Sequence, residues 1–125
     1  MLNTLYFLGV LSYYCLNPTM GMINYHQELG NLPQGDLPSQ YILVAVNDCG
    51  LIGEVGTITV GGKVQEKPVL VYDCLGNDTE WSWMSASNAD TPHLVAAEVD
   101  WFTFKEHPDW FYNGTIALVE FEVSP

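Results

Sequence analysis

The strongest constraint on the fold is a two-residue alternation of apolar and polar side chains in several short runs. This period is typical of β-strands, in which successive side chains point to opposite faces. The runs are rich in valine, isoleucine, tyrosine and phenylalanine, as strands commonly are. The expected strands are Val10–Tyr14, Tyr41–Asn47, Gly56–Val60, Val69–Asp73, Leu94–Val99 and Thr115–Val123. Many short strands indicate a mainly β fold, and a small closed barrel in particular.

The segments between these runs carry turn and loop signals. Gly61-Gly62 predicts a tight hairpin turn. Prolines and glycines between Pro33 and Pro38 predict a polar surface loop, and Gly76–Pro92 predicts another. One helix is expected at Trp101–His107, because Asp100 can cap its first amide groups and the following residue is a proline that ends it.

Length and charge narrow the class of protein. A chain of 125 residues with 48% hydrophobic and 14% charged residues predicts a single domain, residues 1–125, with a sizeable core. Fifteen acidic residues against three basic ones give a net charge of −12, which excludes nucleic acid as a partner and disfavours anionic membrane surfaces. Neutral or cationic partners remain: polysaccharide, a basic protein or divalent ions. An acidic surface that serves only solubility is the alternative.

The opening segment, MLNTLYFLGVLSYYC, is apolar but carries no basic residue, so it is a poor signal peptide. It is also too short to cross a membrane, and no membrane insertion is expected. We interpret it as the first strand of the domain, in which the alternating run starts at Val10, and residues 1–8 could be the remnant of a leader or linker.

Two segments of the chain resemble each other. VAVNDCG at Val44–Gly50 and VLVYDCLG at Val69–Gly76 both run from valines into an Asp-Cys pair and a glycine. A metal site, a disulfide, an active site and an internal duplication are all consistent with this repeat. The histidines His26, His93 and His107 are scattered, with no zinc-ligand spacing, so no metal or cofactor is expected.

Five segments, in order, are similar to the double-psi β-barrel shared by rare lipoprotein A, expansins and barwin-type proteins, and most of all to bacterial rare-lipoprotein-A-like domains. They are GVLSYY (Gly9–Tyr14), ILVAVNDCGLIGEVGTITVGGK (Ile42–Lys63), KPVLVYDC (Lys67–Cys74), LVAAEVDWFTF (Leu94–Phe104) and NGTIALVEFEV (Asn113–Val123). The resemblance implies a six-stranded double-psi β-barrel with one or two short helices. Two similar halves interlock in that fold, so we interpret the Asp-Cys repeat as the trace of a duplication.

The resemblance also implies site residues. KPVLVYDC matches a strand end that carries one family aspartate, which places Asp73 there. Aligning EVDWFTF with the family's Asp-Leu-Ser-x-x-x-Phe places Glu98 on the catalytic aspartate, and a shift of two residues would place Asp100 there instead. Cleavage of a glycosidic bond needs a protonated carboxyl group and usually a second carboxylate. Glu98 and Asp73 are therefore the expected catalytic residues, with Asp100 as the alternative.

Aromatic side chains supply flat faces on which sugar rings could stack. We expect Tyr13, Tyr14, Trp81 and Trp83 to bind substrate, although Trp81 and Trp83 could instead pack over the mouth of the barrel. The resemblance thus implies a monomeric extracellular, periplasmic or cell-surface domain that binds or modifies polysaccharide or peptidoglycan. If the domain is catalytic, the expected activity is lytic transglycosylase-like. The alternative is a non-catalytic structural or protein-interaction module. Whether the chain is an enzyme stays open.

The barrel resemblance bears on the cysteines as well. It brings together the strands that precede Cys49 and Cys74, which predicts a disulfide between them and leaves Cys15 free. Such a bridge would stabilise the fold by about 3 kcal/mol. The alternative is that both are buried free thiols in a reducing compartment.

Overall fold

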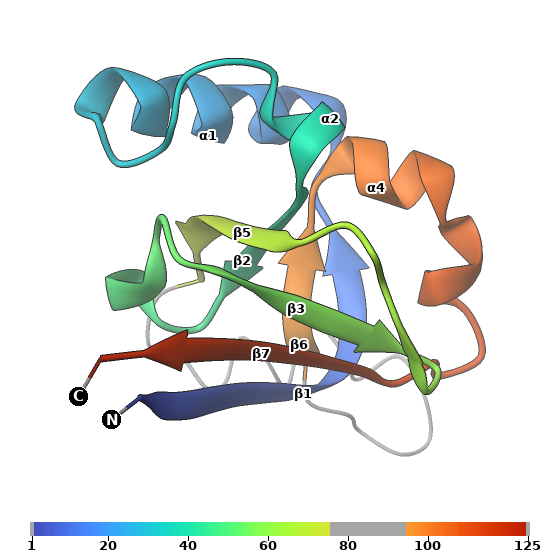
Figure 1. The fold of residues 1–125 in the computed structure, drawn as a ribbon. Helices are drawn as coiled ribbons and strands as arrows, with labels where there is room; N and C mark the ends of the chain where they lie inside the picture. The colour runs from blue at the N-terminus through green and yellow to red at the C-terminus, as the bar shows by residue number, and fades with distance from the viewer. Residues whose placement is uncertain (1, 76–94, 125) are drawn as a thin grey trace.

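The structure, a computed structural model, describes residues 2–75 and 95–124 and forms a β-barrel with short helices above it (Figure 1). The strands are β1 (Asn3–Tyr13), β2 (Ile42–Val46), β3 (Val55–Val60), β4 (Lys63–Val64), β5 (Val69–Cys74), β6 (Val95–Val99) and β7 (Ala117–Val123). The α-helices are α1 (Leu16–Leu29), α2 (Leu37–Gln40) and α4 (Trp101–Glu106). Two 3-10 turns, η1 (Cys49–Leu51) and η2 (Pro108–Phe111), complete the described elements. The mainly β prediction is confirmed.

Six of these strands close into a ring. The strand order is β4-β3-β5-β2-β6-β1-β7, and an additional pairing of β3 with β7 joins the two sides. β4 lies outside the ring, and among the described strands it pairs only with β3, as the second arm of a hairpin whose turn is Gly61-Gly62. The predicted closed barrel is therefore confirmed, and the pairing of β3 with β7 is the contact that closes it.

The pairings follow an approximate two-fold relation that exchanges β1, β2 and β3 with β5, β6 and β7. The parallel pair β1–β6 maps onto the parallel pair β5–β2, and the antiparallel pair β1–β7 maps onto β5–β3. The pairs β2–β6 and β3–β7 map onto themselves, and both are antiparallel, as a two-fold axis between strands requires.

This relation corrects our interpretation of the Asp-Cys repeat. The two similar segments belong to β2 and β5, which are parallel neighbours in the ring, whereas the two-fold equivalents of β2 and β5 are β6 and β1. The repeat therefore does not mark equivalent positions of two halves. The segments resemble each other because both strands are buried among apolar neighbours and each leads into one cysteine of a single disulfide.

The core has two parts, one inside the barrel and one beneath the helices. Inside the barrel, Val44, Val71 and Phe121 belong to a large apolar cluster built from all six ring strands. Outside it, Leu70 and Tyr72 of β5 pack with Ile23 of α1 in a second cluster. This second cluster holds the helical layer against the barrel wall.

The sequence prediction missed α1. Its residues, LNPTMGMINYHQEL, include a proline, a glycine and several β-branched or aromatic residues, all of which have weak helix propensity. The proline lies in the first turn, where its missing amide hydrogen costs little. Thr19, Ile23 and His26 bury one side of the helix against the barrel, so tertiary packing stabilises it where local preference does not.

Other boundaries match or extend the predictions. α4 lies at the predicted position, capped by Asp100 and followed by Pro108. β1 begins well before the predicted Val10, because Asn3–Gly9 pairs with β7, so most of the segment 1–8 belongs to the barrel. No helix among the described residues combines the length and apolar character needed to cross a membrane.

Candidate functional site

Asp73 and Glu98 lie on the two strands that flank β2. Both are level with Ala45, which pairs in parallel with Asp73 and antiparallel with Glu98. Tyr72 is the extra residue of a β-bulge in the β2–β5 pairing, and this bulge brings Asp73 level with Ala45. Two strand spacings separate the two backbones, roughly 10 Å. The structure thus brings together the two carboxyl groups that the sequence predicted as a pair.

Glu98 is a half-buried acid on the outer face of β6. Its neighbours Ala97 and Val99 face the barrel interior, so the alternation of the strand turns Glu98 outward. Burial is the main cause that raises the pKa of Glu98 to about 7, with a smaller contribution in the same direction from the charge of Asp73. Ser12 on the neighbouring β1 has a smaller opposing effect. A carboxyl group with this pKa can both donate and accept a proton near neutral pH.

Asp73 is held by partners from two other elements. The phenol of Tyr14 donates a hydrogen bond to Asp73 Oδ2 at 2.7 Å. His26 Nε2 of α1 lies 3.7 Å from Asp73 Oδ1. Both carboxylate oxygens of Asp73 therefore face a donor, and the side chain is 18% exposed. Its orientation is fixed while part of it still reaches solvent.

Tyr14 is placed by the end of β1. Its backbone amide donates to Val99 O at 2.8 Å, which anchors it beside the end of β6. Burial, the hydrogen bond to Asp73 and the charges of Asp73 and Glu98 all raise the pKa of Tyr14. Tyr14 therefore stays protonated and acts as a hydrogen-bond donor.

The orientation of His26 follows from the end of α1. Gly30 adopts a φ of 80° there, a conformation that favours glycine, and turns the chain so that the Asn31 amide bonds to His26 O at 2.9 Å. The Asn31 side chain then contacts His26 Nδ1, with Nδ2 at 3.1 Å. Because an amide nitrogen can only donate, Nδ1 accepts and the ring hydrogen of neutral His26 lies on Nε2, toward Asp73.

Asp100 serves the fold. It is fully buried, and its carboxylate accepts hydrogen bonds from the backbone amides of Leu43 and Thr103, both at 3.0 Å, and from the Thr103 hydroxyl at 2.7 Å. These bonds cap α4 and join it to β2. A carboxylate with no exposure and these three donors cannot reach a substrate, so the alternative that placed Asp100 on the catalytic position is not carried forward.

The predicted aromatic residues separate in the structure. Tyr13 stacks on Phe104, with ring centroids 3.7 Å apart, and also contacts Trp101 and Phe111. It therefore belongs to an aromatic cluster with α4 and η2, although 39% of it is exposed. Tyr14 instead faces Asp73. Trp81 and Trp83, with the whole predicted loop Gly76–Pro92, lie outside the described residues.

A disulfide joins Cys49 of η1 to Cys74 at the end of β5, with a Cα–Cα distance of 4.9 Å. It adjoins Asp73 in sequence and ties the strand end that carries this residue to the chain that follows β2. Cys15, just before α1, is a free and exposed thiol. Among residues 2–75 and 95–124, no three His, Cys, Asp or Glu side chains group closely enough to hold a metal ion.

His26 and Asn31 are the site residues that the sequence prediction missed. His26 looked isolated because α1 was not predicted, and nothing local relates it to Asp73, far along the chain. The segment HQELGN, residues 26–31, did carry a signal for the end of a helix, because a glycine commonly follows the last residue of a helix. That signal would have placed Asn31 beside the last turn of a helix and hence near His26.

Comparisons of the chain with protein-family models, curated proteins and solved structures find no match. The functional argument therefore depends on the geometry of the site. Its main features are an acid with a pKa of about 7 and a second carboxylate that accepts a hydrogen bond from Tyr14 and lies 3.7 Å from His26.

Proposed function

We propose that the chain is a glycan-cleaving barrel domain that acts on a cell-wall polysaccharide such as peptidoglycan, with Glu98 as the acid and base and Asp73 as the stabilising carboxylate. The observation that carries the proposal is the pairing of these two groups across β2, with the pKa of Glu98 raised to about 7 by burial and by Asp73. Most enzymes that cleave glycosidic bonds use two carboxyl groups held in different environments.

In the proposed reaction, protonated Glu98 donates its proton to the glycosidic oxygen as the bond to the anomeric carbon breaks. Positive charge develops on the sugar ring, and ionised Asp73 stabilises it. The 6-hydroxyl of the same sugar then attacks the anomeric carbon and gives its proton to Glu98. The products are a free chain end and a 1,6-anhydro sugar, and Glu98 is protonated again, so no water is consumed.

Tyr14, His26 and Asn31 act as positioning residues in this scheme. Tyr14 holds Oδ2 of Asp73 through a hydrogen bond, His26 lies 3.7 Å from Oδ1, and Asn31 orients His26. Tyr14 also supplies a ring face beside the acids. A fixed carboxylate stabilises developing charge better than a mobile one because it need not reorganise during the reaction.

We further propose that the barrel is of the double-psi type found in rare lipoprotein A and expansins. The two-fold relation among the strand pairings supports this, because two interlocking halves are a property of that fold. The Cys49–Cys74 disulfide favours a location outside the cytoplasm, at the cell surface or in the periplasm.

The direct test is incubation of the protein with purified peptidoglycan, followed by mass spectrometry of the soluble products. We expect anhydro-sugar products from the wild type and a loss of at least 100-fold in rate from Glu98→Gln. Glu122→Gln is the matched control, because it removes the same charge from an exposed position on β7. Its rate should equal that of the wild type.

Cellulose and chitin are the comparison polymers. Product from one of them and none from peptidoglycan would change the substrate but keep the mechanism. Absence of product from all three would rule out catalysis. A sedimentation assay with the insoluble polymers then separates the remaining cases: retained binding that Tyr14→Ala weakens supports a non-catalytic glycan-binding module, and no binding removes the glycan proposal.

A further inference from the structure

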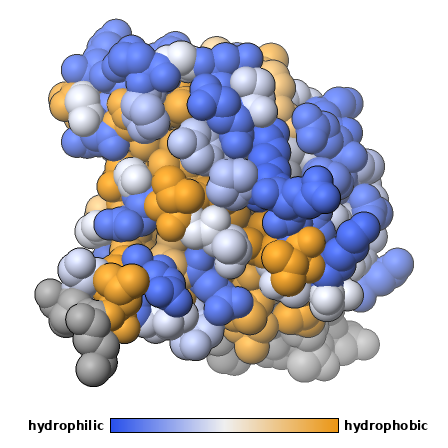
Figure 2. All heavy atoms as spheres, viewed as in Figure 1, coloured by the Kyte–Doolittle hydropathy of each residue, from blue (hydrophilic) through white to orange (hydrophobic). Residues whose placement is uncertain are grey.

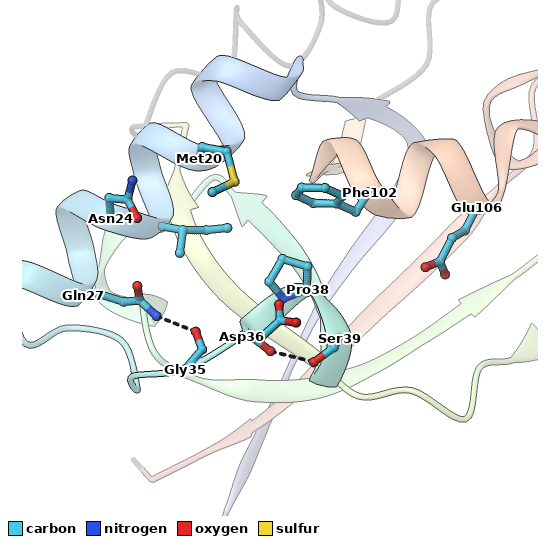
Figure 3. Close-up of a pocket in the computed structure, with 10 residues that line it drawn as sticks. Met20, Asn24, Gln27, Gly35, Asp36, Pro38, Ser39, Phe102 and Glu106 are labelled. Atoms are coloured by element: carbon cyan, nitrogen blue, oxygen red, sulfur yellow. Dashed lines mark hydrogen bonds between the residues drawn. The ribbon is translucent and has the colours of Figure 1, made fainter.

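A groove of about 450 Å³ lies between α1, the segment that leads into α2, and α4 (Figure 3). Its apolar lining comes from Met20 and Ile23 of α1, Pro38 of α2 and Phe102 of α4. Its size falls in the range of ligand-binding pockets. Neither Asp73 nor Glu98 lines it, so its use does not depend on the function proposed above.

Two carboxylates lie on different walls of this groove. Asp36 precedes α2, and its side chain makes no capping bond to that helix. Glu106 lies on the last turn of α4, 61% exposed, and its carboxylate is 3.9 Å from His107 Nε2. Figure 3 shows the sulfur of Met20 directed toward the ring of Phe102, with the ring of Pro38 below them. The groove therefore combines apolar walls with negative charge.

The surroundings add to the negative potential. The chain carries a net charge of −12, and the surface over the helices is largely hydrophilic, whereas apolar residues gather over the strands below (Figure 2). Anionic ligands are disfavoured at such a groove, and a neutral apolar ligand would leave the two carboxylates without partners. The complementary ligand has an aliphatic stem that ends in a positive charge.

We propose that this groove binds a lysine side chain from a short peptide segment of a partner protein. The four methylene groups of the lysine lie against Met20, Ile23 and Phe102, and its ammonium group lies between Asp36 and Glu106. The amide side chains of Asn24 and Gln27, which also line the groove, are available to the peptide backbone.

The two carboxylates are not equivalent, because one lysine of the chain already contacts this wall. The ammonium group of Lys67 donates a hydrogen bond to the backbone oxygen of Pro38 at 2.6 Å, and Pro38 is two residues from Asp36. This bond places a positive charge on the wall of the groove that also carries Asp36. Glu106 therefore contributes more than Asp36 to binding of the incoming lysine.

The test is an NMR titration of the isotopically labelled protein with acetyl-Leu-Lys-Leu-amide. Two matched peptides replace the lysine with norleucine, which keeps the stem, or with glutamate, which reverses the charge. We expect saturable shifts at Gln27, Ser39 and Glu106, at least three-fold weaker binding of the norleucine peptide, and no binding of the glutamate peptide. n-Butylamine tests whether the amine and stem suffice without a peptide.

The variants sharpen the assignment. Glu106→Gln should weaken binding of the lysine peptide about two- to five-fold and Asp36→Asn by less, whereas Glu122→Gln, on β7, should have no effect. Met20→Gln should weaken the lysine and norleucine peptides alike. Equal affinity for lysine and norleucine, shifts that map away from the groove, or no saturable shifts would overturn the proposal. Butylamine binding as tight as that of the peptide would also overturn it and indicate a small-molecule site.

Discussion

Asp73 and Glu98 occupy the same level of the barrel on opposite sides of β2, and the charge of Asp73 contributes to the raised pKa of Glu98. Neither residue is close to the other in sequence. Their coupling depends on a parallel pairing, β2–β5, and an antiparallel one, β2–β6, that meet at Ala45. The bulge at Tyr72 sets the register of the first of these. The proximity of the two acids thus depends on the strand pairings of the barrel.

The coupling itself is measurable. Removing the charge in Asp73→Asn should lower the pKa of Glu98 from about 7, but this pKa should stay above 4.5 because burial is the larger cause. Carbon-13 NMR of the Glu98 carboxyl group across pH 3–9 reads this directly. Asp109→Asn, an exposed acid on η2, is the control and should leave the Glu98 titration unchanged. An unchanged pKa in Asp73→Asn would show that the two carboxyl groups do not interact.

Glu98 should also make stability depend on pH. The folded carboxyl group keeps its proton up to about pH 7, whereas in the unfolded chain it releases it near 4.5. The folded state therefore binds more protons between these values, and this contribution to stability falls as the pH rises from 4.5 to 7. Glu98→Gln should be more stable than the wild type at pH 8 by about 1–2 kcal/mol, after allowance for solvent screening.

Urea unfolding at pH 4.5, 6 and 8 measures this difference. The advantage of Glu98→Gln should grow between the first and last values and then level off. A difference that stays constant with pH would mean that Glu98 is not buried enough to hold its proton.

Asp100 should be a major source of stability. Asp100→Ala leaves the amides of Leu43 and Thr103 and the hydroxyl of Thr103 without their buried acceptor, which should cost about 2–4 kcal/mol in the free energy of unfolding. Asp36→Ala is the matched control, because Asp36 precedes α2 without a capping bond and should change stability by less than about 0.5 kcal/mol. Equal losses in the two variants would contradict the assigned role of Asp100.

Gly56 should be required for closure of the barrel. A Cβ atom at this position would collide with the carbonyl oxygen of Glu120 and lie 2.6 Å from Phe121 Cδ1, at the seam between β3 and β7. Gly56→Ala should destabilise the protein by about 2–3 kcal/mol, measured by thermal or urea unfolding. Gly21→Ala is its counterpart: a Cβ there meets nothing within 4 Å, so the helix should gain about 0.5–1 kcal/mol.

Loss of the disulfide should weaken the fold without abolishing it. Cys49→Ser with Cys74→Ser opens a loop with a sequence separation of 25 residues, and the unfolded chain gains entropy worth about 3 kcal/mol. Cys15→Ala removes only an exposed thiol that makes no capping bond to α1, and it should leave stability nearly unchanged. Mass spectrometry after alkylation provides an independent check, because two further thiols should become reactive only after reduction.

Much of the barrel could be predicted from short stretches of the chain. Short alternating or β-branched runs located all six ring strands, because both signals are carried by neighbouring residues on one strand. The cap at Asp100 and the stop at Pro108 located α4 for a similar reason, since both signals act within one helical turn. The start of β1 and the whole of α1 escaped, because burial against β7 and against the outer wall of β5, and not local preference, holds these residues in place.

The candidate site divides in the same way. Asp73 and Glu98 stand out as acids at or near the ends of apolar strands, and a comparison of local motifs was enough to select them. Their coupling, the placement of Tyr14 and His26 around Asp73, and the complete burial of Asp100 come from pairings between residues far apart in the chain. No local pattern encodes a distance of that kind, because it exists only after the ring of strands has closed and α1 has packed against it.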